Sequence, residues 1–442
     1  MKLVDETVSV VGLGYIGLPT AIVAARAGYH VFGCDVSEER VNDIAAGRAI
    51  FNEPGMSEEL TSALASGMFL ASTKIQSAKY FVIAVPTPFF KGKKADLSYV
   101  FSAAEAIACV IDKGSTVILE STVPVGTTNK MAMLIARSSG LIAGEDFFVA
   151  HCPERVLPGQ IFKELRENDR VVGGACANAT RNAVSFYKKF VHGKIHATDD
   201  RTAEMVKLVE NSSRDAQIAF ANQVADMADK AGIRPKEVIE LANCHPRVSI
   251  LNPGVGVGGH CIAVDPWFLI ESFPHETALL KKVREVNDRR PFQVVNQILA
   301  GVRKAKSRPT CDRIPKVAIL GLTFKPDADD MRGSPALQIT NILNKCSQTL
   351  ELVVCEPNLS GDDLARFGFA ANGLWNAIAD ADVVAILVAH SQFKQIAAED
   401  LVSKIVVDPV SLLDGVMDKS VVGGATHSAE FGVLPKEQQK TL

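Results

Sequence analysis

The first strand and turn of the chain restrict its possible folds more than any other segment. Residues 7–11 are β-branched and apolar, residues 12–17 read GLGYIG, and residues 20–28 have a helical composition. This is G-x-G-x-x-G between a strand and a helix, where the glycines allow a tight turn, a close approach to a pyrophosphate and close helix packing. Backbone N–H groups at the start of such a helix bind anions. The segment predicts a dinucleotide-binding domain.

The second strand predicts which dinucleotide is used. Residues 30–34 end in Asp35, where an acidic side chain is expected to hydrogen-bond the ribose 2′-hydroxyl and to repel a 2′-phosphate. NAD is therefore favoured. Arg40 lies five residues further on and would suit the 2′-phosphate of NADP, so NADP remains an alternative.

Later strands end in residues that suit a ligand crevice. Strands expected at 81–85 and from 115 are followed by Thr87 and Thr122. Strand ends line the cofactor crevice in doubly wound sheets, so both threonines are candidate cofactor contacts; simple helix caps are the alternative. Glu154 and Arg155 follow a strand at 147–152, and are interpreted either as a surface ion pair or as a water-activating base beside an anion clamp.

The middle of the chain predicts long helices. Residues 202–231 contain no proline or glycine, and their apolar spacing indicates one long helix. On it Lys207, Asn211 and Arg214 recur at spacings of four and three and share a face; a solvated polar stripe is the alternative. A second helix is expected at about 278–304.

Between these helices lies a cysteine in a glycine-rich loop. Residues 254–259 hold four glycines, Cys261 follows, and Asp265 lies four residues beyond it. Glycines let the backbone bend tightly and approach a ligand, so the loop favours an exposed thiol that can attack a carbonyl. Most cysteines, however, pack as small buried hydrophobes.

After a polar, basic stretch at 303–310, interpreted as a linker, the α/β pattern restarts. Strands are expected at 316–322, 351–355, 381–388 and 405–408, with a polar loop at 323–335. Lys325 and Arg332 in that loop would suit a diphosphate, or are simply solvated. The sequence predicts an α/β fold with two doubly wound Rossmann-like domains joined by a long central helix, divided at 1–200, 201–302 and 312–442.

Composition narrows the partners. A net charge of −3 offers no general attraction for nucleic acid or an acidic membrane, and a small molecule is the expected partner. No apolar run approaches the roughly 18 residues of a membrane span. The nine cysteines are scattered without a C-x-x-C pair, which argues against a disulfide framework or a metal site. A cytoplasmic location is expected.

Together these motifs resemble the nucleotide-sugar 6-dehydrogenase family, over about residues 7–420. Its members join an NAD-binding domain through a long helix to a UDP-binding domain, and oxidise a sugar C6 alcohol to a carboxylate with two NAD. The strings at 151–159, 202–212, 245–248 and 258–268 are similar to the members that act on UDP-N-acetyl-D-mannosamine. Val255 departs from the proline common in them.

The resemblance implies roles for individual residues. The Cys261 thiolate captures the C6 aldehyde as a thiohemiacetal, which is oxidised to a thioester and hydrolysed. Lys207 matches the lysine that stabilises the oxyanion, Asn211 would hold the same oxygen or a water, and Asp265 matches the carboxylate assigned to proton transfer.

Further contacts follow from the same resemblance. Glu154 and Thr122 match positions around the water and hydroxyl. Implied substrate contacts are Arg155, Val156, Lys207, Asn211, Arg214, His245, Arg247, Gly258, Phe324 and Lys325. Implied NAD contacts are Gly12, Gly14, Tyr15, Ile16, Gly17, Asp35, Arg40, Thr87, Thr122 and Arg332. A homodimer is implied, because an arginine at the position of Arg247 reaches the substrate of a neighbouring subunit in relatives.

Alternative functions remain at this stage. A 6-dehydrogenase for UDP-N-acetylglucosamine or another UDP-sugar would keep the same chemistry. A two-electron dehydrogenase of the 3-hydroxyacid type needs no cysteine and leaves the C-terminal domain unexplained. A non-catalytic nucleotide-sugar binding protein would require neither Lys207 nor Cys261 in working form.

Overall fold

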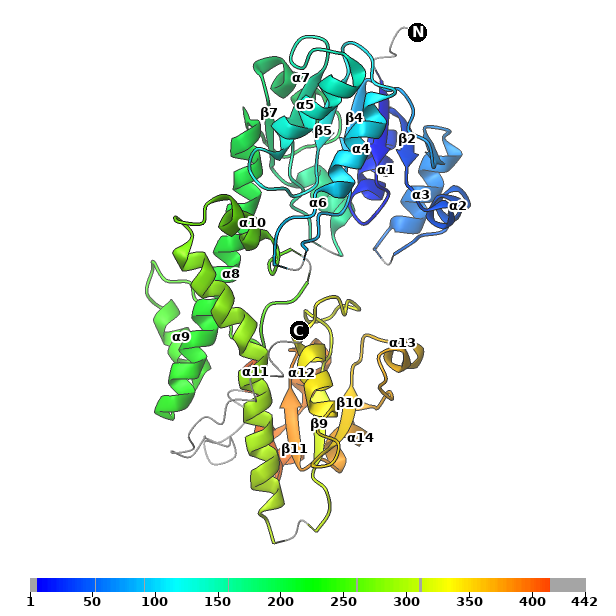
Figure 1. Cartoon of the computed structure of the whole chain (residues 1–442). Helices are drawn as coiled ribbons and strands as arrows, with labels where there is room; N and C mark the ends of the chain where they lie inside the picture. The colour runs from blue at the N-terminus through cyan, green and yellow to red at the C-terminus, as the bar shows by residue number, and fades with distance from the viewer. Residues whose placement is uncertain are drawn as a thin grey trace. The chain divides into compact units, whose positions relative to one another are not determined.

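The computed structural model describes residues 6–51, 53–90, 92–157, 159–259, 261–309 and 312–413. The chain divides into two compact units, Met1–Ser213 with Val264–Lys281 and Arg214–Ala263 with Lys282–Leu442. The helix α8 (Asp200–Ala231) contributes residues to both units (Figure 1). No helix in the described ranges is long and apolar enough to cross a membrane.

The first unit is built on an eight-stranded sheet in the order β3-β2-β1-β4-β5-β6-β7-β8. All neighbours pair in parallel except β6 and β7, which are antiparallel. The strands are β1 (Thr7–Val11), β2 (His30–Cys34), β3 (Phe69–Ser72), β4 (Tyr80–Ile83), β5 (Thr116–Leu119), β6 (Phe148–His151), β7 (Arg170–Gly174) and β8 (Ile195–Asp199). The helices are α1 (Gly17–Arg26), α2 (Glu38–Ala45), α3 (Met56–Ala65), α4 (Ser98–Ala108), α5 (Thr127–Ser139), α6 (Ile161–Glu167), α7 (Ala177–Tyr187) and α10 (Asp265–Ser272).

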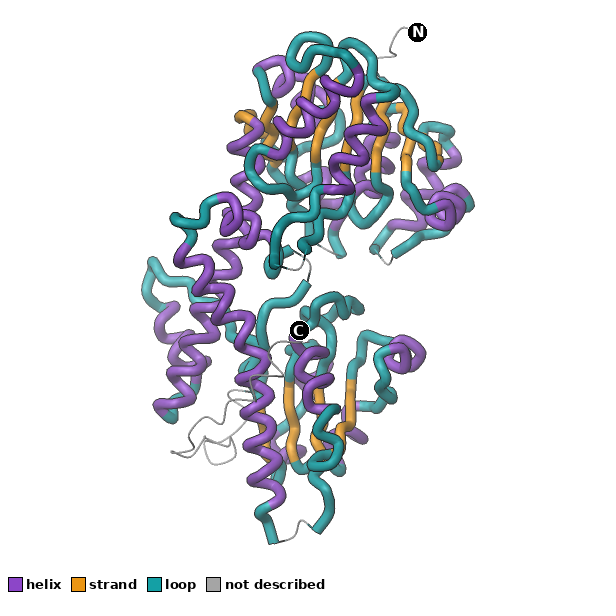
Figure 2. Tube along the Cα trace, viewed as in Figure 1, coloured by secondary structure: helices purple, strands orange, loops and turns teal. Residues whose placement is uncertain are grey.

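Helices cover both faces of this sheet, as the purple and orange segments of Figure 2 show. Successive strand residues point to opposite faces, so Val10 joins one apolar cluster, with α1 and α7, while Val11 joins another, with α4 and α5. Burial on both faces explains why the central strands are almost continuously apolar.

The second unit contains a four-stranded parallel sheet in the order β10-β9-β11-β12. Its strands are β9 (Lys316–Leu320), β10 (Glu351–Cys355), β11 (Val383–Ile386) and β12 (Ile405–Val407). Its helices include α9 (Pro235–Asn243), most of α11 (Ala278–Lys306), α12 (Pro335–Asn344), α13 (Gly361–Arg366) and α14 (Leu374–Ala379), with two 3₁₀ turns at Ser391–Gln395 and Ala398–Leu401.

The predicted fold class is confirmed, with two local corrections. Residues 303–306, interpreted as a linker, form the last turn of α11, where positive side chains interact favourably with the helix dipole. The polar loop expected at 323–335 ends one residue earlier, because α12 begins at Pro335. The strands β3, β7 and β8 were not predicted, and the end of the proposed domain at 312–442 lies outside the described residues beyond 413.

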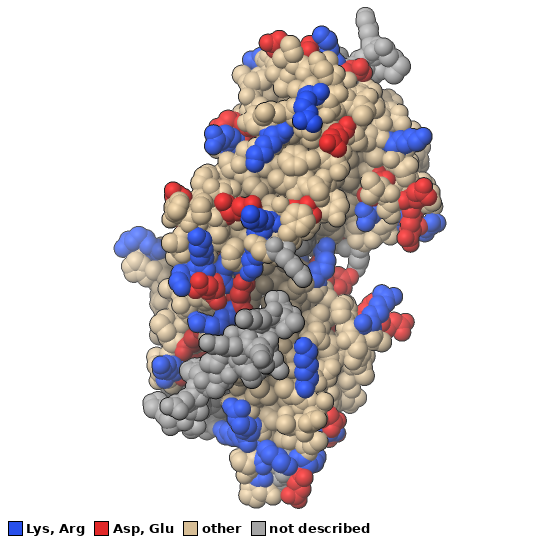
Figure 3. Space-filling view, viewed as in Figure 1, with Lys and Arg blue, Asp and Glu red and all other residues tan. Residues whose placement is uncertain are grey.

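The surface agrees with the small net charge. On the face drawn in Figure 3, acidic and basic side chains are interspersed within each unit rather than segregated by sign.

Candidate functional site

The three glycines of the first turn are needed for different structural reasons. Gly12 has φ +93°, and a Cβ there would lie 2.6 Å from the Ala84 carbonyl oxygen. A Cβ at Gly17 would lie 1.8 Å from the Gly12 oxygen, so both positions are required by the turn itself. A Cβ at Gly14 would meet no atom within 4 Å. The turn therefore leaves an open approach at Gly14, as a bound pyrophosphate requires.

Asp35 fastens the end of β2 to this turn. Its carboxylate accepts hydrogen bonds from the Leu13 amide and the Arg40 guanidinium, each at 2.9 Å, and from the Ser37 amide at 3.0 Å. Asp35 is buried. Because the Arg40 cation already pairs with Asp35, the local charge is balanced without a 2′-phosphate, and the site fits NAD.

The ends of β4 and β5 meet through the two predicted threonines. The Thr87 hydroxyl donates to the Thr122 carbonyl oxygen at 2.7 Å, and the Ser121 hydroxyl donates to the Val85 oxygen at 2.7 Å. The structure therefore brings Thr87 and Thr122 together at the same edge of the sheet as the glycine turn.

A buried carboxylate lies between α8 and α10. Asn211 Nδ2 donates to Asp265 Oδ2, and Leu208 packs against Phe268 and Leu269, which holds α10 on α8. Burial raises the pKa of Asp265 to about 6, while the Asn211 hydrogen bond and the positive charge of Lys207 act to lower it. Lys207, Asn211 and Asp265 thus form one cluster within the first unit, whereas Arg214 lies in the second unit.

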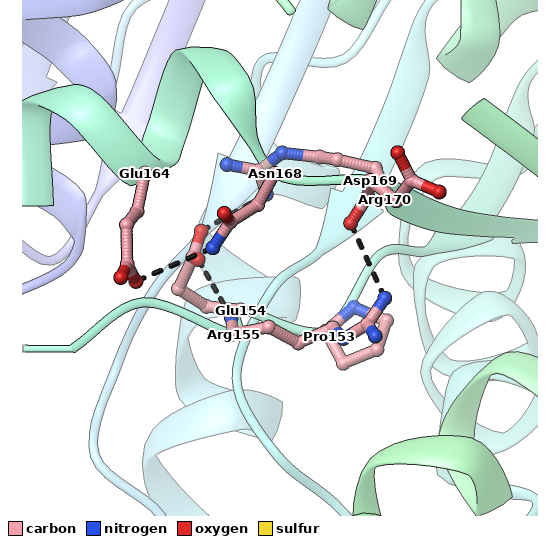
Figure 4. Close-up of a pocket in the computed structure, with 7 residues that line it drawn as sticks. All are labelled: Pro153, Glu154, Arg155, Glu164, Asn168, Asp169 and Arg170. Carbon is pink, nitrogen blue, oxygen red and sulfur yellow. Dashed lines mark hydrogen bonds and ion pairs between the residues drawn. The ribbon is translucent and has the colours of Figure 1, made fainter. Parts of the chain in front are cut away.

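Two ion pairs hold the segment that carries Glu154 and Arg155, and Figure 4 shows the buried one, between Glu154 and Arg170. Glu154 pairs with Arg170 at 2.9 Å, and both side chains are almost completely buried. Arg155 donates to the Asp169 carbonyl oxygen at 3.2 Å and pairs with Glu210 on α8 at 2.9 Å. The adjacent Glu154 and Arg155 therefore have different charged partners.

Arg170 is a residue that sequence reasoning missed. It begins β7, its guanidinium lies 5.1 Å from the Tyr187 ring centroid, and Tyr187 donates to Glu120 at 2.7 Å. Burial raises the pKa of Glu120 to about 7, partly offset by the charge of Arg170. No local pattern marks Arg170, because its partner Glu154 lies on another element.

The cysteine loop is anchored within the second unit. The Gly254 amide donates to Asn222 at 2.8 Å, and the Gly254 oxygen accepts from Arg290 at 2.9 Å. Cys261, two residues after Gly259, is exposed. The loop therefore exposes Cys261, while hydrogen bonds hold the start of the loop at Gly254.

The same loop passes close to the segment after β9. A Cβ at Gly258 would lie 2.8 Å from Phe324 Cβ and 2.7 Å from Pro335 Cδ, so only glycine fits. The Gly259 amide donates to the Arg332 oxygen at 3.2 Å, and Lys325 Nζ lies 5.9 Å from the Phe324 ring centroid. The predicted residues Gly258, Phe324 and Lys325 and the backbone of Arg332 are thus gathered together.

His390 was also missed by sequence reasoning. It is fully buried, accepts from the Asp327 amide at 3.0 Å, and contacts Glu356 at 3.1 Å. The amide donor on Nδ1 identifies the tautomer that carries its proton on Nε2. His390 therefore ties the segment after β9 to the end of β10. By contrast, Arg214, His245 and Arg247 are exposed.

These features coincide with one protein family. Three domain models of the UDP-glucose/GDP-mannose dehydrogenase family match the chain: the NAD binding domain at residues 6–191, the central domain at 201–289 and the UDP binding domain at 318–416. The chain belongs to this family, and it is an NAD-dependent oxidoreductase. The resemblance inferred from the motifs and the choice of NAD are confirmed.

Relatives within the family give a finer comparison. The chain is 45% identical over 409 residues to a UDP-N-acetyl-D-mannosamine dehydrogenase of Campylobacter jejuni, covering 90% of this chain and 98% of the relative. It is 42% identical over 410 residues to an NDP-N-acetyl-D-galactosaminuronic acid dehydrogenase of Ralstonia nicotianae, covering 91% and 95%. The structure of a UDP-D-ManNAc dehydrogenase from Pyrococcus horikoshii is similar with a TM-score of 0.84 at 38% identity, covering 95% and 98%.

Proposed function

We propose that the protein oxidises UDP-N-acetyl-D-mannosamine at C6 to UDP-N-acetyl-D-mannosaminuronate. The observation that carries the proposal is the cluster of Lys207, Asn211 and buried Asp265 on α8 and α10, in a chain that also exposes Cys261 in a fixed glycine loop. Relatives at 45% identity that cover almost the whole chain carry the mannosamine name, which supports this sugar.

The residues divide the chemistry as follows. NAD, when bound, accepts a hydride from C6 in each of two oxidations. Asp265, with its pKa raised to about 6, is mainly ionised at neutral pH and accepts the proton of the C6 hydroxyl, directly or through water. Cys261 adds to the resulting aldehyde to give a thiohemiacetal, whose oxidation leaves a thioester. Water hydrolyses the thioester to the acid and returns the thiol. Lys207 stabilises the oxyanion at each stage.

The ligand contacts are assigned on the same basis. The open backbone at Gly14 and the buried Asp35 support a pyrophosphate and a ribose site in the first unit. In the second unit Lys325 and Phe324 beside Gly258 support a site for the sugar nucleotide. Glu154 accepts a hydrogen bond from the Arg155 amide at 2.6 Å and pairs with buried Arg170 at 2.9 Å, which supports a role in positioning Arg155 beside its proposed place near the reacting water.

The protein is proposed to be a cytoplasmic homodimer. The proposed domains are those predicted from the sequence, at residues 1–200, 201–302 and 312–442. Phe220 and Met227, seven residues apart on α8, are 52% and 61% exposed, and Leu241 on α9 is 67% exposed. Such exposed apolar side chains suit a second copy of the chain. Light scattering should give twice the monomer mass, and the double variant Phe220→Glu with Met227→Glu should give a monomer.

Two measurements test the reaction and the sugar. Two NADH should form per UDP-sugar without accumulation of aldehyde, and Cys261→Ala should stop turnover to the acid. Initial rates with UDP-N-acetylmannosamine should exceed those with its C2 epimer UDP-N-acetylglucosamine at least about tenfold, because an epimer leaves buried polar groups unpaired. One NADH per sugar would contradict the thioester route.

A second candidate substrate follows from the comparison. Because a relative at 42% identity is named for N-acetyl-D-galactosaminuronic acid, UDP-N-acetylgalactosamine belongs in the same panel. A clear preference for it, or for UDP-N-acetylglucosamine, would change the sugar and leave the mechanism intact.

A further inference from the structure

Glu53 is a buried carboxylate that connects two segments of the first unit. It lies just before α3 and is 5% exposed. Its Oε2 accepts from the Tyr15 hydroxyl at 3.0 Å and from the Gly159 amide at 2.9 Å, and its Oε1 accepts from the Ile161 amide at 2.8 Å. One side chain thus receives three hydrogen bonds from two distant parts of the sequence.

The first of these parts is the glycine turn. Tyr15 lies between Gly14 and Gly17, and its ring packs against Phe51 with centroids 4.8 Å apart. Because the ring is held by Phe51 and the hydroxyl by Glu53, the position of Tyr15 depends on the segment before α3 as well as on the turn.

The second part is the end of the segment that carries Arg155 and Val156. This segment is fixed at its start by the Glu154–Arg170 pair and in its middle by the Leu157 amide, which donates to Glu164 at 2.7 Å. Glu53 fixes its end. The attachment through Glu53 also reaches the glycine turn, because the same carboxylate accepts from the Tyr15 hydroxyl.

We propose that Glu53 is a positioning residue that couples NAD binding to UDP-sugar binding. A cofactor that restrains Tyr15 restrains the Glu53 carboxylate, and Glu53 in turn restrains the backbone amides of Gly159 and Ile161, which follow Arg155 and Val156 in the chain. Energetic coupling between two ligands is reciprocal, so the sugar nucleotide tightens the cofactor by the same factor. This inference rests on the proposed assignment of Tyr15 to NAD and of Arg155 to the sugar nucleotide.

Calorimetry tests the coupling without turnover. The dissociation constant of UDP-N-acetyl-D-mannosamine is measured for the full chain, alone and saturated with NADH. We expect NADH to tighten the sugar at least about fivefold in the wild type. In Tyr15→Phe and in Glu53→Gln the ratio should fall to about one, because an amide has one acceptor oxygen where the carboxylate has two. The double variant should resemble either single variant, since both act in one chain of contacts.

Matched controls separate coupling from general destabilisation. Tyr99→Phe on α4 and Glu58→Gln on α3 make the same chemical changes at exposed positions and should keep the wild-type ratio. A merely structural role for Glu53 would lower the melting temperature and weaken each ligand without changing the ratio. If Glu53→Gln does not fold, the ratio of dissociation constants measured for Tyr15→Phe, which removes only one hydroxyl, decides whether the coupling exists.

The outcomes distinguish this inference from the function on which it rests. A ratio near one in the wild type, or a wild-type ratio in Tyr15→Phe, overturns the coupling while leaving both ligand sites in place. Gly14→Ala and Arg155→Ala are measured in parallel for their own ligands. If Gly14→Ala binds NADH normally and Arg155→Ala binds the sugar normally, the site assignments themselves are wrong, and the coupling falls with them.

Discussion

Asp265→Asn should stabilise the first unit while it removes activity. Burial raises the pKa of Asp265 from its ordinary 3.8 to about 6, and one pKa unit corresponds to about 1.4 kcal/mol. Keeping this carboxylate ionised in the folded protein therefore costs roughly 3 kcal/mol relative to the unfolded chain. Asparagine has nearly the same shape and no charge, and its oxygen still accepts from Asn211.

The sign of the pH dependence follows from the raised pKa. Between about pH 4 and 6 the folded state holds a proton that the unfolded state has lost, so wild-type stability falls as pH rises through this window. The asparagine variant does not lose stability in this way, because its side chain does not ionise. Its advantage over the wild type should therefore grow by about 2 kcal/mol between about pH 4.5 and 7.5.

The assay uses the two tryptophans of the chain. In a Trp375→Phe background, Trp267 on α10 remains as the reporter close to Asp265, and urea unfolding is followed by its fluorescence at both pH values. Glu105→Gln, at an exposed position of α4, is the control and should show no such pH dependence. The same stability difference at both pH values would refute a buried, ionised Asp265.

Turnover of Asp265→Asn should fall at least about 100-fold, and wild-type kcat/KM should decline below about pH 6.

Three further predictions concern the first unit. Gly14→Ala should fold normally but raise the KM for NAD at least about tenfold. Gly17→Ala should fail to fold, because a Cβ at Gly17, unlike one at Gly14, would collide with the backbone of the turn. Normal NAD kinetics in Gly14→Ala would contradict this prediction. Arg170→Met leaves the Glu154 carboxylate buried without its cation, and should lower the free energy of unfolding by about 3–5 kcal/mol in urea; an unchanged free energy of unfolding would contradict this. Asp35→Ala should reduce the kcat/KM preference for NAD over NADP, which is expected to be at least about tenfold in the wild type; an unchanged preference would remove Asp35 from cofactor selection.

Much of the architecture could be predicted from local sequence. The strand, glycine turn and helix of residues 7–28 are specified by neighbours in the chain, since turn geometry and helix initiation depend on consecutive residues. The glycines around Cys261 likewise indicated a loop with an exposed thiol, and periodicity indicated the long helix α8. These features are short-range, so a pattern of residue types is enough to recognise them.

Partners from distant segments could not be predicted in this way. Arg170 and Glu53 carry no local signature, because each is defined by groups that the sheet and its loops bring within hydrogen-bond distance. The antiparallel pairing of β7 with β6 is also a long-range feature, which strand composition does not specify.

The chemistry of the site shows the same division. The sequence by itself determined which reactive groups the protein has: a thiol in a glycine loop, and a lysine and an amide on one helix face. Only the tertiary structure decided their environment, because the burial of Asp265 at the start of α10, against α8, and not its identity, shifts its pKa toward neutrality. The pKa of a side chain depends on all the groups packed around it, and that packing is a property of the whole fold.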